Sequence, residues 1–357
     1  MTAGLPWKAE VSRLPPYDLP SPRARVKVDL NESPYDFPAD LKDEVWARVR
    51  ERSWSRYPRH PPIALTTALE RRLSWPKEGI VAGNGSNELI QAILSVALSP
   101  GTSFLVPRPS FPVYAILGTI HGGDVRFLDL DADFAYREEL LASAIAATCP
   151  RVVLLCSPNN PTGTVASGDV VRLALDDPSR LVILDEAYQD FAAENLFSLL
   201  ASHENLVILR TFSKAWGLAG LRIGYLLAHP AVAREIGKAV LPFNLNVFSE
   251  ACALVALEHE ERLRETVERI KESRAALFAA MAALPGVRPY ESQSNFILFE
   301  TPLPPQKIYD ALLARGVLVR DVSRGHRLER ALRVSVGTPE ENAIFLRELG
   351  ARLATGP

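Results

Sequence analysis

The sequence contains little cysteine and no long uninterrupted apolar run. Its 357 residues include only three cysteines, Cys149, Cys156 and Cys252, which are scattered and each lie in an apolar stretch. This usage argues against a disulfide framework and predicts reduced cysteines in the core. No segment reaches the length of apolar residues that a membrane helix needs, and the N-terminus lacks the pattern of a signal peptide. We therefore predict a cytoplasmic protein without a membrane span.

The sequence also lacks a strong excess of charge and any metal-ligand pattern of histidines. The formal net charge is −2, which gives no basis for a nucleic-acid or anionic membrane surface. The six histidines show no metal-ligand spacing, and we predict no metal site. A hydrophobic fraction of 47% and a charged fraction of 23% are typical of a globular enzyme. The length allows one large and one small domain.

Strand and helix patterns alternate through the first two thirds of the chain. Prolines interrupt residues 1–28, which we interpret as an arm, because proline is excluded from helix and sheet interiors. Amphipathic helical patterns follow at 40–52 and 63–73, and strands and helices then alternate from residue 79 to residue 227. This alternation predicts an α/β domain with a mostly parallel sheet that helices cover on both faces.

A long helical pattern and a smaller lobe follow. Apolar residues recur at helical spacing from residue 249 to residue 284, which predicts one helix of roughly 50 Å. Because that length exceeds the needs of one domain, we expect the helix to connect two domains. The patterns that follow predict an α+β lobe in β-α-β-β-α order, with elements at 295–299, 307–315, 317–319, 331–336 and 339–353.

Polar side chains follow three of the predicted apolar strands. Asn160 follows the first of these strands, Asp185 ends the second with Tyr188 three residues later, and Lys214 follows the third. Ligands of open α/β sheets bind at the carboxyl ends of the strands, so we expect these groups to lie together. Their chemistry suits pyridoxal phosphate. A carboxylate can keep the pyridine nitrogen protonated, an amide and a phenol can bind a ring oxygen, and a lysine can form a Schiff base with the aldehyde.

Motifs across nearly the whole chain resemble fold-type I, class II aminotransferases, and within them the histidinol-phosphate aminotransferases. Three motifs lie in the sheet region: Asn-Asn-Pro-Thr-Gly at 159–163, Asp-Glu-Ala-Tyr at 185–188, and Ser-Lys at 213–214 with Gly-Leu-Arg-Ile-Gly at 220–224. Others in family order are Leu-Asn-Glu-Ser-Pro-Tyr at 30–35, Arg-Tyr-Pro at 56–58, Pro-Ser-Phe-Pro-Val-Tyr at 109–114 and Leu-Arg-Val-Ser-Val-Gly-Thr at 332–338. The resemblance implies a large cofactor domain at 48–257, a small domain at 29–47 and 258–357, and the arm at 1–28.

The resemblance also implies roles for individual residues toward pyridoxal phosphate. Lys214 would hold the cofactor and move the substrate proton, Asp185 would pair with the ring nitrogen, and Asn160 and Tyr188 would bind the ring oxygen. Phe111 would stack on the ring. The cofactor phosphate would be bound at a helix start and by nearby donors: Gly85, Ser86, Asn87, Thr211, Ser213 and Arg222. Tyr57 would reach the phosphate in a neighbouring subunit, which implies a homodimer.

Substrate contacts are also implied by the resemblance. Arg333 would grip the α-carboxylate, Tyr17 and Arg320 would contact a phosphate on the substrate itself, and Asn31 would contact the substrate. We therefore expect transamination between histidinol phosphate and 2-oxoglutarate, which gives imidazole-acetol phosphate and glutamate. An aromatic amino-acid aminotransferase and a threonine-phosphate decarboxylase are the alternatives.

Two functions of other classes fit less well. A transcriptional regulator with an aminotransferase-like domain would need a DNA-binding domain, and the arm before residue 29 is too short and not basic enough. A nicotinamide dehydrogenase would need Gly-x-Gly-x-x-Gly between a strand and a helix, and Gly83-Asn-Gly85 lacks the third glycine.

Overall fold

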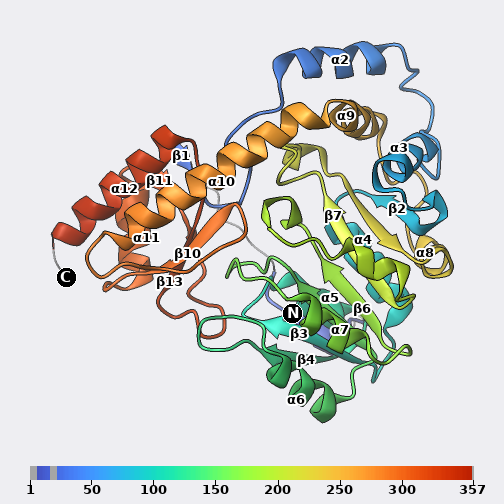
Figure 1. Cartoon of the computed structure of the whole chain (residues 1–357), viewed down its shortest axis with the longest axis horizontal. Helices are drawn as coiled ribbons and strands as arrows, with labels where there is room; N and C mark the ends of the chain where they lie inside the picture. The colour runs from blue at the N-terminus through green and yellow to red at the C-terminus, as the bar shows by residue number, and fades with distance from the viewer. Residues whose placement is uncertain (1–5, 17–21, 356–357) are drawn as a thin grey trace.

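The computed structural model describes residues 6–16 and 22–355 and has two lobes (Figure 1). The large lobe contains a seven-stranded sheet of order β2-β8-β7-β6-β5-β3-β4. Only β8 is reversed, because it pairs antiparallel with both β2 and β7 while the remaining pairs are parallel. The strands are β2 (Ile80–Gly83), β3 (Ser103–Arg108), β4 (Asp124–Asp129), β5 (Val152–Cys156), β6 (Leu181–Asp185), β7 (Leu206–Thr211) and β8 (Gly224–Ala228). The predicted mostly parallel α/β sheet is thus confirmed.

Helices cover both faces of this sheet. Residues of β5 alternate between the two layers: Val153 and Leu155 pack in one apolar cluster, and Val152 and Leu154 in the other. The first cluster includes α3 (Ile63–Leu73), α6 (Glu138–Thr148), α7 (Gly168–Leu175) and α9 (Val247–Glu258), against which α2 (Ala39–Arg50) packs. The second includes α4 (Ser86–Ala97), α5 (Val113–Ile120) and α8 (Pro230–Gly237). Burial on both faces explains why the central strands are almost entirely apolar.

Short helices lie in the connections. They are α1 (Ala9–Ser12) and the 3₁₀ turns η1 (Lys77–Gly79), η2 (Gln189–Phe191), η3 (Phe197–Ala201) and η4 (Ala219–Leu221).

The small lobe has its own sheets and core. A four-stranded antiparallel sheet has the order β12-β13-β10-β9, and β1 pairs in parallel with β11. The elements are β1 (Val26–Lys27), β9 (Arg288–Pro289), β10 (Phe296–Glu300), α11 (Pro305–Ala314), β11 (Val317–Leu318), β12 (Arg320–Asp321), β13 (Ala331–Ser335) and α12 (Pro339–Ala354). Strand β1 lies inside the predicted arm, so the end of that segment belongs to a sheet. The β-α-β-β-α order is present, with β12 as an additional strand before β13.

The prediction of one helix from 249 to 284 is wrong. The chain forms α9 and then α10 (Glu260–Ala282), separated by His259 at φ −114° and ψ 29°. The ring of His259 lies 2.9 Å from Glu44, and Glu260 accepts a forked bond from Arg72 at 2.6 and 2.7 Å. A single residue leaves the helical conformation while the apolar stripe resumes on α10, so the apolar spacing gave no sign of the break.

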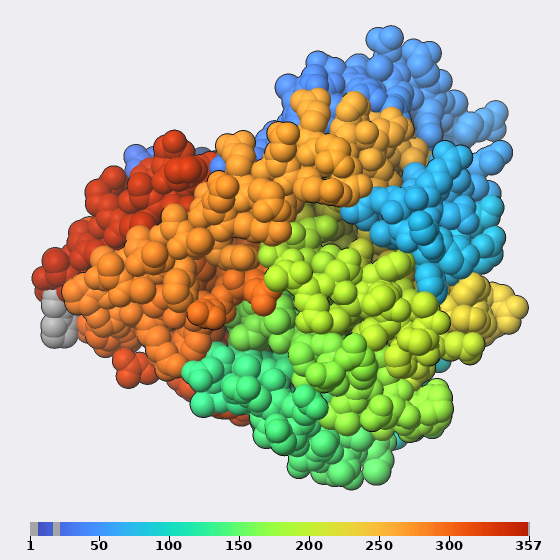
Figure 2. All heavy atoms as spheres, viewed as in Figure 1, coloured from blue at the N-terminus to red at the C-terminus, as the bar shows by residue number. Residues whose placement is uncertain are grey.

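Helix α10 packs into both lobes, as the long helix was expected to do. Leu263, Val267 and Ile270 belong to a core cluster of the large lobe, whereas Leu277 and Met281 belong to that of the small lobe. Figure 2 shows its atoms as an orange band that crosses from the small lobe toward α2. The exact domain boundaries given above stay a prediction.

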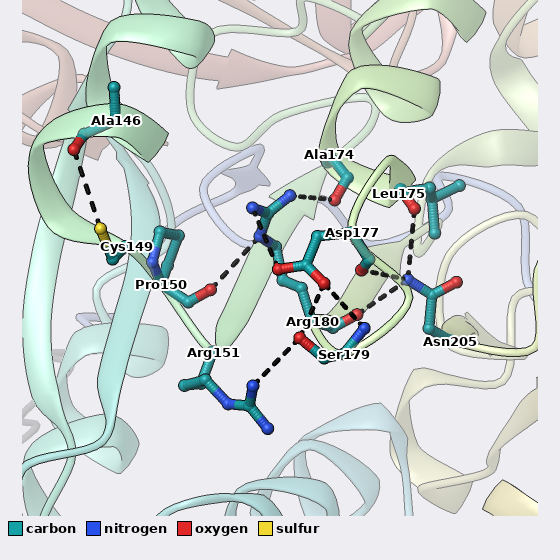
Figure 3. A network of polar contacts seen from close by, with 10 residues as sticks. All are labelled: Ala146, Cys149, Pro150, Arg151, Ala174, Leu175, Asp177, Ser179, Arg180 and Asn205. Carbon is teal, nitrogen blue, oxygen red and sulfur yellow. Dashed lines mark hydrogen bonds and ion pairs between the residues drawn. The ribbon is translucent and has the colours of Figure 1, made fainter.

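The amino-terminal edge of the central strands is held by a polar network (Figure 3). Asn205, just before β7, donates to the carbonyls of Leu175 (3.4 Å), Asp177 (3.1 Å) and Arg180 (2.8 Å). The buried Arg180 in turn donates to the carbonyls of Pro150 (3.2 Å) and Ala174 (2.8 Å). These contacts tie together the loops that precede β5, β6 and β7, at the edge opposite the strand ends that carry Asp185 and Lys214.

The three cysteines are free thiols, but only two of them lie in the core. Cys156 and Cys252 are buried, whereas Cys149 is exposed, which corrects the prediction for that residue. Cys149 adopts a left-handed conformation (φ 41°) at the end of α6, where the chain turns toward β5. No helix in the described part of the chain is long and apolar enough to cross a membrane. The cytoplasmic location stays a prediction.

Candidate active site

A cavity of about 790 Å³ lies at the carboxyl edge of the parallel strands. Asn160, Asp185 and Lys214 line it from the large lobe, and Arg320 and Arg333 line it from the small lobe. A second cavity, of about 1000 Å³, lies between α3 and α9 and contains none of these strand-end groups. Because the amine, the carboxylate and the guanidinium groups that could take part in catalysis converge in the first cavity, we take it as the candidate active site.

Lys214 presents its amine inside this cavity. It follows β7, and its Nζ donates to the carbonyl of Leu30 at 3.0 Å and lies 5.9 Å from the centre of the Tyr188 ring. Among the described residues no carboxylate forms an ion pair with it. Burial, reinforced by the positive charge of Arg333, lowers the pKa of Lys214 to about 8. A substantial neutral fraction of this amine is therefore present near pH 8, as a nucleophile or a base requires.

Asp185 is buried at the end of β6 and is held by two donors. The hydroxyl of Tyr114, on α5, donates to its Oδ2 at 2.7 Å, and the backbone N–H of Ala187 donates to its Oδ1 at 3.0 Å. Burial raises the pKa of Asp185, and the Tyr114 hydrogen bond opposes that rise. Within the described ranges Asp185 has no ion-pair partner, so a cation beside it would compensate a buried charge.

Tyr114 was not predicted as a site residue. It ends the motif at 109–114, which drew attention only to Phe111, and a tyrosine on an apolar helix has no distinctive sequence pattern. The sign that could have identified it is chemical: a fully buried tyrosine needs a partner for its hydroxyl.

The segment Asp29–Asn31 closes one side of the cavity. Its three successive carbonyls accept from three different elements: Asp29 O from Arg333 (2.5 Å), Leu30 O from Lys214, and Asn31 O from Asn295 (3.0 Å). The amide of Asn31 donates to the Tyr188 hydroxyl at 2.9 Å.

Arg333 and Asn160 face each other across the lobes. The guanidinium of Arg333, in β13, donates to the Asn160 side chain at 2.5 Å and stands 5.2 Å from the Phe296 ring centre. Asn160 lies in the loop after β5 and Tyr188 in the segment after β6. The amide, the phenol and the arginine that sequence analysis selected therefore meet in one place, although 173 positions separate Asn160 from Arg333.

A cluster of donors lies at the start of α4. Gly85 precedes this helix at φ 85° without a side-chain cap, so the first backbone N–H groups of Ser86 and Asn87 lack intrahelical partners. A Cβ on Gly85 would lie 2.5 Å from Nη2 of Arg222, so glycine lets the arginine approach the helix start. Arg222 also donates to the Ser213 hydroxyl at 3.3 Å, and Thr211 donates to the same oxygen at 3.0 Å. Such a group of donors suits an anion, and a phosphate in particular.

The remaining predicted residues have three different outcomes. Phe111 and Arg320 line the cavity, and the Phe111 ring meets that of Tyr114 edge to face at 5.5 Å. Tyr57 lies outside it: its side chain is 81% exposed and stacks on Phe243 with ring centres 4.5 Å apart. Tyr17 lies outside the described residues. No group of metal-ligating side chains occurs in the described ranges.

Comparisons with known proteins point in one direction. The family model for aminotransferases of class I and II matches residues 25–349. Histidinol-phosphate aminotransferase 2 of Nitrosococcus oceani is 37% identical over 348 residues, which is 96% of each chain.

Solved structures share the fold. Histidinol-phosphate aminotransferase from Sinorhizobium meliloti, in complex with pyridoxal-5′-phosphate, superposes with a TM-score of 0.89 at 24% identity over 99% of both chains. L-threonine-O-3-phosphate decarboxylase from Porphyromonas gingivalis superposes with a TM-score of 0.82 at 23% identity, covering 92% of this chain and 99% of the other. At these identities the superpositions establish the fold alone.

Proposed function

We propose that this chain, which belongs to the aminotransferases of class I and II, uses pyridoxal phosphate to transfer the amino group of histidinol phosphate to 2-oxoglutarate. The products would be imidazole-acetol phosphate and glutamate. The observation that carries the proposal is the convergence in one cavity of an amine (Lys214), a buried carboxylate (Asp185) and two guanidinium groups (Arg320 and Arg333). The relatives that match at 37% identity carry the name of this activity.

The residues of the cavity fit the cofactor at each of its ends. Asp185 is a buried carboxylate without an ion-pair partner in the described part of the chain, which suits a protonated pyridine nitrogen. The helix start at Gly85 and the Arg222 guanidinium offer donors that suit a phosphate, and a Cβ on Gly85 would intrude on them. Lys214 supplies an amine whose pKa is lowered to about 8. The site thus offers a complementary group for the nitrogen, the phosphate and the aldehyde.

Pyridoxal phosphate supplies an aldehyde that condenses with amines and a ring that accepts the electrons of a broken C–H bond. The side chains would do the remaining work. Lys214 would act as the nucleophile that holds the cofactor and as the base that moves the substrate proton. Asp185 would keep the ring nitrogen protonated, and Arg333 would bind the substrate carboxylate with its planar fork. Lys214→Ala should remove both the visible absorption of the holoenzyme and transamination, and a variant that transaminates normally would overturn the proposal.

Substrate choice is assigned through Arg320. It lines the cavity in the small lobe, and no carboxylate within the described ranges pairs with it, so its charge is available to an anionic end of a substrate. We expect Arg320→Ala to raise KM for histidinol phosphate by tenfold or more, with a smaller change for glutamate, because a charged hydrogen bond contributes about 1.5–3 kcal/mol. Equal changes for both substrates would contradict the assignment.

A substrate panel separates the alternatives. Turnover of histidinol phosphate well above that of phenylalanine supports the proposal, and the reverse identifies an aromatic amino-acid aminotransferase. Carbon dioxide release from threonine phosphate without a 2-oxo acid identifies a decarboxylase.

We also propose that two copies of the chain form a dimer and that Tyr57 acts in the partner's site. Its exposed ring stacks on the exposed Phe243, and the single chain exposes further large apolar side chains: Trp46, Trp54, Ile63, Leu241 and Phe248. Surface of this kind favours association. Mixing Tyr57→Ala with Lys214→Ala subunits tests it, because a hybrid dimer would contain one site with both Tyr57 and Lys214. Restored cofactor affinity in half of the hybrid sites supports the proposal, whereas equally weak binding in the hybrid and the Tyr57→Ala dimer contradicts it.

A further inference from the structure

Asn31 is a buried residue whose polar groups all have partners inside the protein. Its backbone N–H donates to the Ser335 hydroxyl at 2.8 Å, and its carbonyl accepts from Asn295 at 3.0 Å. Its side-chain Nδ2 donates to the Tyr188 hydroxyl at 2.9 Å, and its Oδ1 accepts from the Ser335 hydroxyl at 3.2 Å. The residue is only 1% exposed. Asn31 lines the cavity with the little surface it exposes, and the substrate contact implied by the sequence stays a prediction.

The two side-chain contacts fix the direction in which Asn31 points. The Ser335 hydroxyl has one hydrogen, and its bond to Oδ1 uses that hydrogen, while the same oxygen accepts the Asn31 N–H. With Oδ1 turned toward Ser335, the Nδ2 group faces Tyr188 and must donate to it. The Tyr188 oxygen is then an acceptor in this contact, and its own hydrogen remains available for another partner. A reversed amide would place Oδ1 against Tyr188 and consume that hydrogen.

We infer that Asn31 is a positioning residue that directs the Tyr188 hydroxyl hydrogen toward the ring oxygen of the cofactor, and that Ser335 fixes the orientation of Asn31. The inference rests on the proposed function, which assigns Tyr188 to that ring oxygen. The Tyr188 ring is also held by an edge-to-face contact with Phe296, with centres 5.2 Å apart. This contact restricts the ring, while the hydroxyl hydrogen can still rotate about the C–O bond.

The ionisation of Tyr188 agrees with a donor role. Burial raises the pKa of Tyr188 to about 12, against the opposing influence of Arg333 and of the Asn31 hydrogen bond. The hydroxyl thus keeps its hydrogen at neutral pH, and the bond from Asn31 makes it a better donor by drawing charge from the oxygen.

Backbone geometry decides which variants are informative. Asn31 has φ 54°, in the left-handed region that asparagine and glycine tolerate and alanine does not. Asn31→Gly removes the side chain without introducing strain, so the fold should be retained. Ser335→Ala tests the same assembly from its other end without touching Tyr188. Ser294→Ala is a matched control, because Ser294 is buried next to Asn295 and its hydroxyl has no hydrogen-bond partner among the described residues.

The experiment is a pH titration of the visible absorption band of each holoenzyme. A hydrogen bond donated to the ring oxygen stabilises its negative charge, so the bound chromophore loses its proton at lower pH. We expect Tyr188→Phe and Asn31→Gly to raise the midpoint, the latter by about half a unit to one unit, given the usual strength of one hydrogen bond. Ser335→Ala should shift it in the same direction by less, and Ser294→Ala should not shift it.

The double variant Asn31→Gly/Tyr188→Phe supplies the decisive comparison. If Asn31 acts through Tyr188, its removal should have no further effect once the hydroxyl is gone. Additive shifts would assign Asn31 a purely structural role and overturn the inference, as would an unchanged midpoint in Asn31→Gly. A wild-type protein that binds pyridoxal phosphate without any visible band would instead overturn the proposed function itself.

Discussion

Replacing Tyr114 by phenylalanine should weaken cofactor binding by changing the charge on Asp185. The Tyr114 hydroxyl donates one of the two hydrogen bonds that hold this buried carboxylate, at 2.7 Å. Phenylalanine keeps the ring and its packing but leaves Oδ2 without that donor. A hydrogen bond to a charged group contributes about 1.5–3 kcal/mol, which corresponds to about a tenfold to hundredfold loss of affinity for pyridoxal phosphate.

The pH dependence of the loss follows from the direction of the pKa shift. Burial already raises the pKa of Asp185, and the Tyr114 bond lowers it, so the variant should raise it further. A protonated Asp185 cannot neutralise a cationic ring nitrogen. As the pH is lowered, the affinity of the variant for pyridoxal phosphate should therefore begin to fall at a higher pH than that of the wild type. The difference in affinity between the two proteins should be largest at acidic pH.

The assay is a spectral titration of the apo protein with pyridoxal phosphate at a series of pH values. Tyr136→Phe is a matched control, because the Tyr136 hydroxyl donates to the backbone carbonyl of Cys156 at 2.9 Å rather than to the carboxylate. The control should lose some stability and keep the wild-type pH profile. An unchanged affinity and pH profile in a folded Tyr114→Phe protein would refute the role assigned to this hydrogen bond.

Three further predictions test other parts of the structure. The pKa of Lys214 is lowered from 10.5 to about 8, so the folded apo protein binds fewer protons than the unfolded chain between these pH values. Its free energy of unfolding relative to Lys214→Met, measured in urea, should therefore rise from pH 8 to pH 10.5. A difference that does not change with pH would contradict the lowered pKa. Gly85→Ala should weaken cofactor binding by tenfold or more because its Cβ displaces Arg222, whereas Gly101→Ala, at a similar φ of 87° with nothing within 4 Å, should leave the binding constant unchanged. Asn205→Ala should lower the free energy of unfolding by about 1–3 kcal/mol without a change in cofactor affinity, because it deprives three carbonyls of a donor at the edge of the sheet opposite the cavity.

The part of the site that could be predicted from the sequence is the part whose residues are brought together by the topology of the sheet. Asn160, Asp185 and Lys214 each follow a strand, and parallel neighbours β5, β6 and β7 bring those strand ends to one edge without further information. Pattern and position were sufficient there. The resemblance supplied Arg333 and Arg320, since no local signal assigns an arginine in a late strand to a distant cavity.

The remainder depends on contacts that sequence spacing does not encode. Tyr114 reaches Asp185 across 71 positions, and Asn31 meets Ser335 across 304. Each is an ordinary polar residue in its own segment, and its role exists only through the partner. The break at His259 was missed for a similar reason, since what distinguishes it is the contact of His259 with Glu44 and of the adjacent Glu260 with Arg72, both far away in the sequence.

The segment Asp29–Asn31 explains why residues from both ends of the chain are needed to hold the amine of Lys214 in position. The described residues give Lys214 a single hydrogen bond, to Leu30 O, and that carbonyl is held in place by its neighbours, which bind Arg333 on one side and Asn295 and Ser335 on the other. Those three partners belong to the small lobe, whereas Lys214 and Tyr188 belong to the large one. The position of the amine relative to the phenol is therefore set by how the lobes meet. A substitution that loosens the small lobe, such as one in the core around Phe345, should disturb the spectrum of the cofactor even though it lies outside the cavity.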